Sequence, residues 1–182
     1  MANLVVTESE FKGIVHKLCR DISNSEWRPD YVVGLTRGGL IAATMISHYF
    51  EVPCETLKVS LRDGGESESN LWMAEQAFGY VPKEERGSGD AETDPAYRKK
   101  ILIVDDINDT GATLEWIKRD WPSGCLPRHP AWDAVWHRNV KFAVLVNNES
   151  SGFKNVDYSG FTINKFDDPC WVVFPWENWW QN

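Results

Sequence analysis

Residues 101–113 read Ile-Leu-Ile-Val-Asp-Asp-Ile-Asn-Asp-Thr-Gly-Ala-Thr, and no other stretch constrains the fold of this chain so strongly. Four branched apolar residues in succession predict a strand that is buried on both faces, as in a parallel sheet. The polar residues that follow predict a loop that opens a helix. The sequence therefore predicts a strand–loop–helix unit of an α/β fold, with its polar groups at the carboxyl end of the strand.

The polar half of this run suits a sugar phosphate. Asp105 and Asp106 can hold two neighbouring ribose hydroxyls by charge-assisted hydrogen bonds and can recruit a hard divalent cation such as magnesium. Residues 109–113 offer backbone N–H groups, two hydroxyls and the positive end of a helix dipole, which together suit a phosphate dianion. Gly111 lets the backbone approach a ligand closely. The alternative interpretation is a plain strand end followed by a capped turn.

A second apolar strand also ends in groups that bind anions. Residues 31–36 run directly into Arg37-Gly38-Gly39, and residues 40–50 follow as an apolar helix. The carboxyl ends of parallel strands meet at one edge of a sheet, so this loop and the acidic pair are expected to lie close together. Taken alone, the same residues are also consistent with a glycine turn beside a surface arginine.

Residues 101–113 resemble the PRPP-binding fingerprint of the type I phosphoribosyltransferases (PRPP is 5-phosphoribosyl 1-pyrophosphate): an apolar strand, two acidic residues and Asp-Thr-Gly-x-Thr. Residues 36–39, Thr-Arg-Gly-Gly, are similar to the Ser-Arg-Gly-Gly of the xanthine-guanine branch, whose loop binds pyrophosphate and often contains a non-proline cis peptide bond. The resemblance implies a type I phosphoribosyltransferase fold: a mostly parallel central sheet flanked by helices, a flexible lid loop and a small carboxyl-terminal hood.

The resemblance also implies an activity, the transfer of phosphoribosyl from PRPP to a nucleobase with Mg²⁺ as cofactor. Asp109 would be the catalytic residue, because it would take the N7 proton of a purine or stabilise the cationic base. Asp105 and Asp106 would hold the metal. The implied PRPP-binding residues are Arg37, Gly38, Asp105, Asp106, Asp109, Thr110, Gly111, Ala112 and Thr113.

The carboxyl-terminal residues 168–177, Asp-Pro-Cys-Trp-Val-Val-Phe-Pro-Trp-Glu, are similar to the Trp-Ile-x-x-Pro-Trp-Asp region that closes the base pocket of xanthine-guanine enzymes. The match makes Trp171 the stacking partner of the base and Val172 the residue whose backbone reads its edge. Four of the ten tryptophans lie in the last twelve residues, so the alternative is that they bury a carboxyl-terminal arm or a subunit contact.

Two positions depart from the purine enzymes. Those enzymes carry a lysine at the end of the strand before the hood, where it hydrogen-bonds the 6-oxo group, whereas this chain has Asn147 and Asn148, with Lys154 as a substitute to consider. An amide both donates and accepts hydrogen bonds, so a preference for oxo-purines does not follow. Val173 stands where the xanthine-guanine branch has an acidic residue. We therefore expect a purine acceptor whose identity stays open.

The composition fits one globular domain over residues 1–182, since 42% of the residues are hydrophobic and 25% are charged. The net charge of −8 argues against binding to nucleic acid or to an anionic membrane. No apolar run approaches the ~20 residues of a membrane span, and the first residues lack the pattern of a secretion signal, so we expect a cytoplasmic protein. The four cysteines have neither metal-ligand nor disulfide spacing and are expected to be free thiols.

Further elements follow from local patterns. Residues 7–10, Thr-Glu-Ser-Glu, form a capping box that predicts the start of a helix. We also expect strands over residues 55–61 and 141–146, and a helix from Gly111 to Trp121 that stops at Pro122. The apolar face of the first helix is expected to consist of Phe11, Ile14, Val15, Leu18 and Ile22.

Three segments are expected outside the regular core. Residues 62–98 are acidic and contain several glycines, which predicts a long irregular segment: either a lid that closes over the substrates or an insertion without a catalytic part. Residues 122–140 are rich in proline and tryptophan and are expected to be an insertion that forms a packed surface flap or a subunit contact. Residues 150–182 would form the hood and the carboxyl-terminal tail.

Two other functions stay open beside the purine enzyme. The acceptor could be a pyrimidine or orotate, and the same fold also serves regulators that sense PRPP or nucleotides without catalysis. The chain has no basic helix-turn-helix extension and an acidic balance, which favours the enzyme. The expected partners are PRPP and a nucleobase, and by analogy with the family we expect a homo-oligomer, either a dimer or a tetramer.

Overall fold

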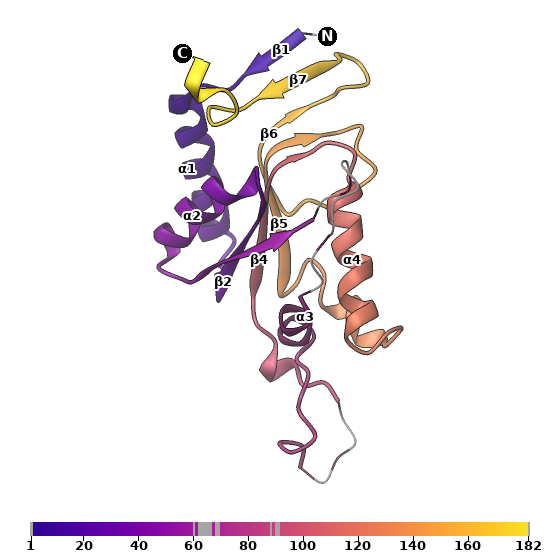
Figure 1. Cartoon of the computed structure of the whole chain (residues 1–182). Helices are drawn as coiled ribbons and strands as arrows, with labels where there is room; N and C mark the ends of the chain where they lie inside the picture. Colours follow the sequence, from indigo (N-terminus) through magenta and orange to yellow (C-terminus); the bar gives the residue numbers. More distant parts are fainter. Residues whose placement is uncertain are drawn as a thin grey trace.

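The computed structural model describes residues 2–59, 61, 67, 70–87, 89 and 92–181. Its centre is a five-stranded sheet in which every neighbouring pair of strands is parallel (Figure 1). In spatial order the strands are β3 (Cys54–Lys58), β2 (Tyr31–Thr36), β4 (Ile101–Asn108), β5 (Val140–Asn148) and β6 (Tyr158–Ile163). The expected α/β class with a mostly parallel sheet is confirmed.

The sheet is covered on both faces, which explains why its central strands are continuous apolar runs. In β4, Ile101 and Ile103 pack into one hydrophobic cluster, whereas Leu102 and Val104 pack into the other. Side chains alternate along a strand, so four apolar residues in a row supply both faces of the sheet. The strand over 31–36 is where the sequence predicted it. The strand β4 begins where predicted but continues through the acidic pair to Asn108, and β3 ends at Lys58 instead of residue 61.

Two helices cover each face (Figure 1). On one side lie α1 (Glu8–Asn24) and α2 (Gly39–Phe50), and on the other lie α3 (Leu71–Phe78) and α4 (Ala112–Gly124). The capping box that opens α1 is confirmed, because the Thr7 hydroxyl accepts from the backbone N–H of Glu10 and the Glu10 carboxylate accepts from that of Thr7. The short 3₁₀ helices are η1 (Pro95–Tyr97), η2 (Pro130–Ala134) and η3 (Trp179–Gln181).

A second, smaller sheet joins the two ends of the chain. It consists of β1 (Ala2–Val5) and β7 (Cys170–Val173), which pair in parallel, and Figure 1 shows it above the carboxyl end of the main sheet. The aromatic tail packs onto α1: the ring of Trp176 meets Phe11 edge to face at 5.1 Å and stacks on Phe174 at 4.9 Å. For Trp176, the alternative that a tryptophan buries the carboxyl-terminal arm is therefore correct.

The expectation of one irregular segment over residues 62–98 is wrong at α3. Met73, Ala74, Ala77 and Phe78 are buried there against the sheet. Their spacing places them on one side of a helix. The helix has only eight residues and is flanked by glycines, so its apolar pattern is too short to predict a helix from the sequence. The helix ends at Gly79, whose φ of 75° forms a left-handed cap. Residues 62–66, 68–69, 88 and 90–91 lie outside the described residues, and the lid stays a prediction.

Residues 122–140, expected to form a packed surface flap or a subunit contact, pack closely onto the sheet, and the subunit contact stays a prediction. Trp132 is buried against Phe78, and its indole N–H donates to the Cys125 carbonyl at 2.9 Å. Trp136 stacks between Trp132 and Phe142 of β5, at centroid distances of 5.6 and 6.1 Å. The segment therefore completes the apolar layer over the sheet beside α4. Large aromatic side chains bury enough area to hold such an irregular segment in place.

The helix α4 passes through Pro122, where the sequence predicted its end. Proline removes its own N–H donor and crowds the carbonyl four residues earlier, but a last helical turn can still form when the following donors are satisfied. Here the backbone N–H of Cys125 donates to the Trp121 carbonyl at 3.1 Å, and the Ser123 hydroxyl donates to the Asp120 carbonyl at 2.6 Å. The helix therefore continues to Gly124 before the chain turns.

All four cysteines are free, as expected. Burial raises the pKa of the Cys19 thiol to about 11 and that of the Cys125 thiol to about 11, so neither is a reactive thiolate at neutral pH. Within the described part of the chain, no helix combines the length and the apolar character needed to cross a membrane.

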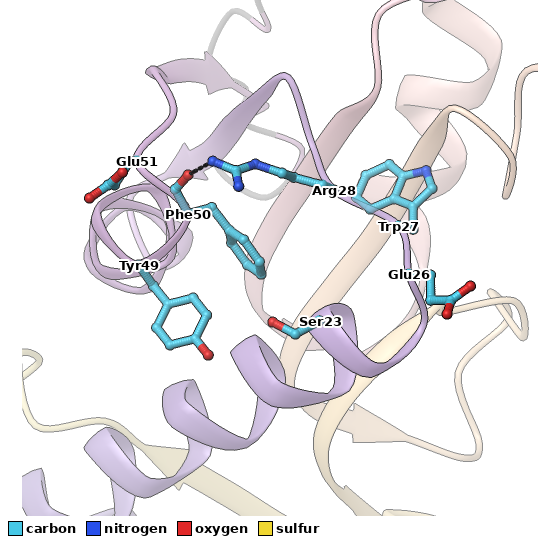
Figure 2. A pocket seen from close by; sticks show the side chains of 7 residues that line it. All are labelled: Ser23, Glu26, Trp27, Arg28, Tyr49, Phe50 and Glu51. Carbon is cyan, nitrogen blue, oxygen red and sulfur yellow. Dashed lines mark hydrogen bonds between the residues drawn. The ribbon is translucent and has the colours of Figure 1, made fainter.

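A cavity of about 440 Å³ lies between the carboxyl-terminal ends of α1 and α2 (Figure 2). The Arg28 guanidinium crosses it and donates to the Phe50 carbonyl. None of the residues that the sequence assigned to PRPP, base or metal lines this cavity, which lies at the end of α2 opposite Gly39. Its lining consists of Ser23, Glu26, Trp27, Arg28, Tyr49, Phe50 and Glu51.

Candidate functional site

The two predicted anion-binding segments meet at the carboxyl edge of the sheet. Strands β2 and β4 are hydrogen-bonded neighbours with Gly34 opposite Val104, so the loop after β2 lies beside Asp105 and Asp106. The Thr36–Arg37 peptide bond in this loop is cis, as the resemblance implied. Arg37 is exposed at the rim of the site.

Glycine is required where this loop touches β4. A Cβ atom on Gly38 would collide with the carboxylate of Asp106, and one on Gly39 would lie 3.0 Å from the Cα of Asp105 and closer still to the Val104 carbonyl. The contacts with the Asp106 carboxylate and with the Val104 oxygen would be shorter than real Cβ atoms show. The two glycines therefore allow the arginine loop and the acidic strand end to pack together as one surface.

The acidic pair has an internally bonded backbone, and both of its side chains are half-buried. The Asp106 N–H donates to Oδ1 of Asp105 at 3.0 Å, and the Ile107 N–H donates to Oδ1 of Asp106 at 2.8 Å. Burial raises the pKa of the Asp106 carboxyl above its usual range, hydrogen bonds from Asp105 and Ile107 oppose this, and the nearby charge of Glu177 raises it further. The ionised form of Asp106 therefore gains from a cation beside it.

The loop over residues 109–113 has the geometry of a helix N-terminus. Gly111 adopts a φ of 87°, and α4 begins at Ala112. The Ala112 N–H donates to the Thr110 hydroxyl at 3.3 Å, and the Glu115 N–H donates to the Gly111 carbonyl at 3.0 Å. The first backbone N–H groups of α4 and the positive end of its dipole thus lie at the end of the loop that follows β4 and its acidic pair, which suits a phosphate group.

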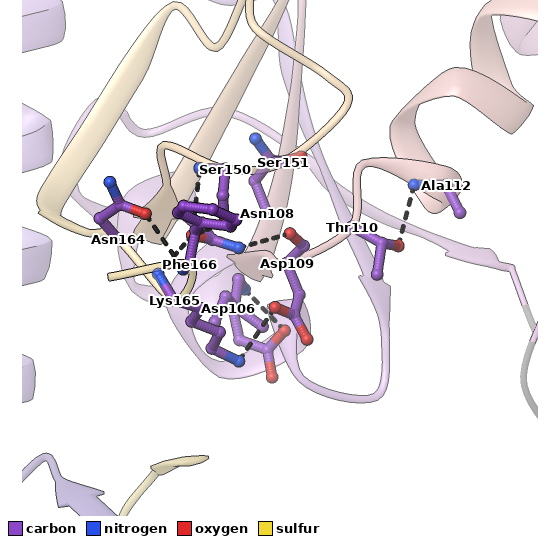
Figure 3. A network of polar contacts seen from close by, with 12 residues as sticks. Asp106, Asn108, Asp109, Thr110, Ala112, Ser150, Ser151, Asn164, Lys165 and Phe166 are labelled. Carbon is purple, nitrogen blue, oxygen red and sulfur yellow. Dashed lines mark hydrogen bonds and ion pairs between the residues drawn. The ribbon is translucent and has the colours of Figure 1, made fainter. Parts of the chain in front are cut away.

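A buried polar network supports this loop from behind (Figure 3). The Asn108 side chain, 2% exposed, donates to Asn147 Oδ1 and to the Phe153 carbonyl at 2.9 Å each, and it accepts from the Ser151 hydroxyl at 2.8 Å. The Gly152 N–H donates to the Thr110 carbonyl at 3.0 Å. The segment after β5 therefore fixes the position of residues 108–110.

Sequence reasoning missed Asn108 and Ser151. The signal for Asn108 is a polar residue at the end of a buried strand, next in the sheet to a second asparagine, Asn147, with which it pairs in register. That adjacency becomes visible only once the order of the strands is known. Ser151 carries no comparable signal.

The residues expected to bind the base lie on β7. Trp171 is 47% exposed, so part of its ring is open to a planar ligand, whereas Val172 is buried against the α1 side of the core. Stacking on Trp171 and edge reading by Val172 stay predictions. Trp179 and Trp180 are largely exposed, at 70% and 62%.

The two amides that stand in place of the family lysine, and Lys154, the substitute considered for it, bind other groups of the protein. Asn148 donates to the Asp109 carbonyl at 2.9 Å and accepts from Ser150, and Asn147 Oδ1 accepts from Asn108. The Lys154 ammonium donates to the Glu149 carbonyl at 2.6 Å. These contacts hold loops together.

Lys165, which sequence reasoning missed, lies in the site. Its ammonium is 2.9 Å from Oδ1 of Asp109, the predicted catalytic carboxylate (Figure 3). The same ammonium lies 5.9 Å from the centre of the Trp171 ring. Lys165 is the one basic residue in the sequence between β6 and β7, which is only a weak indication of a role in the site.

The whole chain, and not only these motifs, can be compared with known proteins. Residues 5–178 match the phosphoribosyl transferase domain family. The chain belongs to this family. Its relatives include the hypoxanthine-guanine phosphoribosyltransferase of Schizosaccharomyces pombe, with 21% identity over 90% of this chain and 85% of that protein. The xanthine-guanine phosphoribosyltransferase of Cereibacter sphaeroides is 29% identical over 85% of this chain and 71% of that protein.

The fold comparison agrees with the family. The purine phosphoribosyltransferase of Pyrococcus horikoshii superimposes with a TM-score of 0.62 and 23% identity, over 98% of this chain and 96% of that one. The type I phosphoribosyltransferase fold inferred from residues 36–39 and 101–113 is thereby confirmed.

Proposed function

We propose that this phosphoribosyl transferase moves the phosphoribosyl group from PRPP to a purine base, giving a nucleoside monophosphate and pyrophosphate. The observation that carries the proposal is the meeting of residues 37–39, the acidic pair and the loop over 109–113 at adjacent strand ends. The printed names of the relatives, which are purine enzymes, support a purine acceptor. We propose that the reaction takes place in the cytoplasm.

In this proposal each part of the site binds or stabilises a defined group of the substrates. Asp105 and Asp106 hold the ribose diol, and the N-terminus of α4 holds the 5′-phosphate. Arg37 and the neighbouring backbone N–H groups stabilise the charge that develops on the departing pyrophosphate. Asp109 takes the N7 proton of the purine or stabilises the cationic base as the bond to the ribose forms.

We infer that the acidic pair also holds Mg²⁺. The described residues contain no cluster of three His, Cys, Asp or Glu side chains, so the metal would take its remaining ligands from the substrate and from water, as Mg²⁺ commonly does. The half-buried position of Asp106 fits this role, because a cation offsets the desolvation cost of its ionised form. When bound, Mg²⁺ supplies positive charge beside the pyrophosphate leaving group.

The test is a panel of acceptor bases incubated with PRPP, with and without Mg²⁺, and scored by pyrophosphate release. The bases are guanine, hypoxanthine, xanthine, adenine, uracil and orotate. The proposal predicts release with at least one purine, and only when Mg²⁺ is present. Release with uracil or orotate alone would assign the chain to pyrimidine chemistry. Release with none of the six would favour a regulator, which a DNA-binding titration at moderate salt would then examine.

A further inference from the structure

Three basic side chains line a cavity at the amino edge of the main sheet, where β4 and β5 begin. The cavity has a volume of about 310 Å³. Arg98 and Lys100 come from the segment that enters β4, and Arg138 comes from the turn that enters β5. No acidic side chain is among the described residues that line it, although the whole chain carries a net charge of −8. Its other lining residues are Trp27, Pro95, Ala134 and Asn139.

The guanidinium of Arg98 is held in place by the backbone and keeps donors for a ligand. Its Nε donates to the Phe78 carbonyl at 3.1 Å, and its Nη1 donates to the Ala134 carbonyl at 3.3 Å. An arginine has five N–H donors in a rigid fork, so three remain that no described group accepts. Burial lowers the pKa of the Arg98 guanidinium from its ordinary value, and the positive charge of Arg138 lowers it further. The two cations are therefore close enough to repel each other, and an anion between them would offset this repulsion.

The other two cations have no counter-charge from the described part of the chain. The side chains of Lys100 and Arg138 form no ion pair with any carboxylate there. Asp30 accepts from the backbone N–H of Lys100 at 2.6 Å, and it does not line the cavity. A single exposed cation is adequately solvated by water, whereas three cations around one cavity, one of them fixed, suit a multiply charged anion.

We propose that this cavity is a second binding site, which takes a phosphate dianion, either free or as the end group of a small phosphate ester. Guanidinium forks match pairs of phosphate oxygens, and an ammonium adds a point charge. The volume lies at the lower end of the range for small-molecule pockets, about 300–1,000 Å³. Lys100 precedes β4 and Asp105 lies near its other end, roughly 16 Å away at about 3.3 Å per residue. The site is therefore separate from the proposed PRPP site, and the inference does not depend on the proposed function.

The test is an NMR titration of the isotope-labelled full chain with inorganic phosphate and, separately, with ribose 5-phosphate. Chloride keeps the ionic strength constant, so that screening of surface charges does not change. The inference predicts saturable shifts of the amide signals of residues 98–100 and 138–139 with at least one probe. Tighter binding of inorganic phosphate would identify the free ion as the ligand, and tighter binding of ribose 5-phosphate would identify an ester. Shifts confined to residues 110–113, or shifts at the cavity that do not saturate, would overturn the inference.

Variants separate a built site from general attraction between charges. Lys100→Met and Arg138→Met each remove a cation that lines the cavity and should weaken binding there about 10-fold, since each loses a charged hydrogen-bond donor. The matched control is Lys99→Met, which removes the same charge from the neighbouring exposed lysine outside the cavity lining and should keep the affinity. An equal loss in all three variants, or no loss in Lys100→Met and Arg138→Met, would overturn the inference. In all three, the response of residues 110–113 to ribose 5-phosphate should stay the same.

Discussion

Replacing Gly39 by alanine tests whether the arginine loop and the acidic strand end work as one surface. The φ of Gly39 lies outside the left-handed region, so alanine is not strained there by its backbone conformation. The expected loss of stability and turnover therefore comes only from steric overlap of the added Cβ atom with β4. The added Cβ would lie 3.0 Å from the Cα of Asp105 and from the carbonyl carbon of Val104, and nearer still to the Val104 oxygen.

The size of the effect follows from these distances. Carbon atoms in contact normally lie about 3.5–4.0 Å apart, and the contact with the Val104 oxygen is the shortest of the three, so the loop and β4 must separate by about 1 Å. Such overpacking costs about 1–3 kcal/mol of folding free energy. In a chain of this size that lowers the melting temperature by about 2–4 °C per kcal/mol. Turnover should fall further, by about 100-fold, since a displacement near 1 Å in a reacting site has that effect.

The assay is pyrophosphate release with PRPP and the best purine of the base panel, together with a thermal melt of each variant. The control is Gly13→Ala, an exposed position in α1 where an added Cβ meets nothing within 4 Å. Alanine is the better helix former, so this control should gain about 0.5–1 kcal/mol of stability and keep full turnover. A folded Gly39→Ala variant with unchanged turnover and PRPP affinity would refute the reasoning.

Three further changes have defined outcomes. Asp109→Asn should keep PRPP affinity in calorimetry and lose most turnover, because a neutral amide neither takes a proton nor stabilises a cation; undiminished turnover would remove Asp109 from catalysis. Asp106→Asn should weaken PRPP binding yet raise the melting temperature at pH 8. Its raised folded pKa means that stability falls as the pH rises above the unfolded value near 4, so the gain should shrink at acidic pH, and a pH-independent difference would count against it. Asn108→Ala should cost about 2–3 kcal/mol in denaturant unfolding, since it leaves buried partners unsatisfied, and a loss under 0.5 kcal/mol would contradict the network's role.

The sequence was informative where the signal is local. The apolar run over 101–104 and the capping box at Thr7 each specify their own conformation through neighbours in the chain. The motif residues also determined which strand ends must carry the site. These features led to the family and to the fold before any long-range contact was known.

The sequence was less informative where burial depends on distant partners. The short helix α3 and the segment around Trp132 are stabilised by packing against the sheet. Their own residues do not indicate which face of the sheet they will cover. Lys165 reaches Asp109 only because β6 lies at the edge of the sheet next to β5, which directs the following loop back over the site. The homo-oligomer and the lid over 62–98 stay predictions.

The central claim is that the end of β4 binds the ribose and the phosphate of PRPP. The most direct measurement is a crystal structure with PRPP and Mg²⁺ bound. The account predicts the ribose hydroxyls on the carboxylates of Asp105 and Asp106, and the 5′-phosphate on the backbone N–H groups of residues 110–113. PRPP bound instead in the cavity beside Arg28 and Tyr49, with the end of β4 free of ligand, would contradict it.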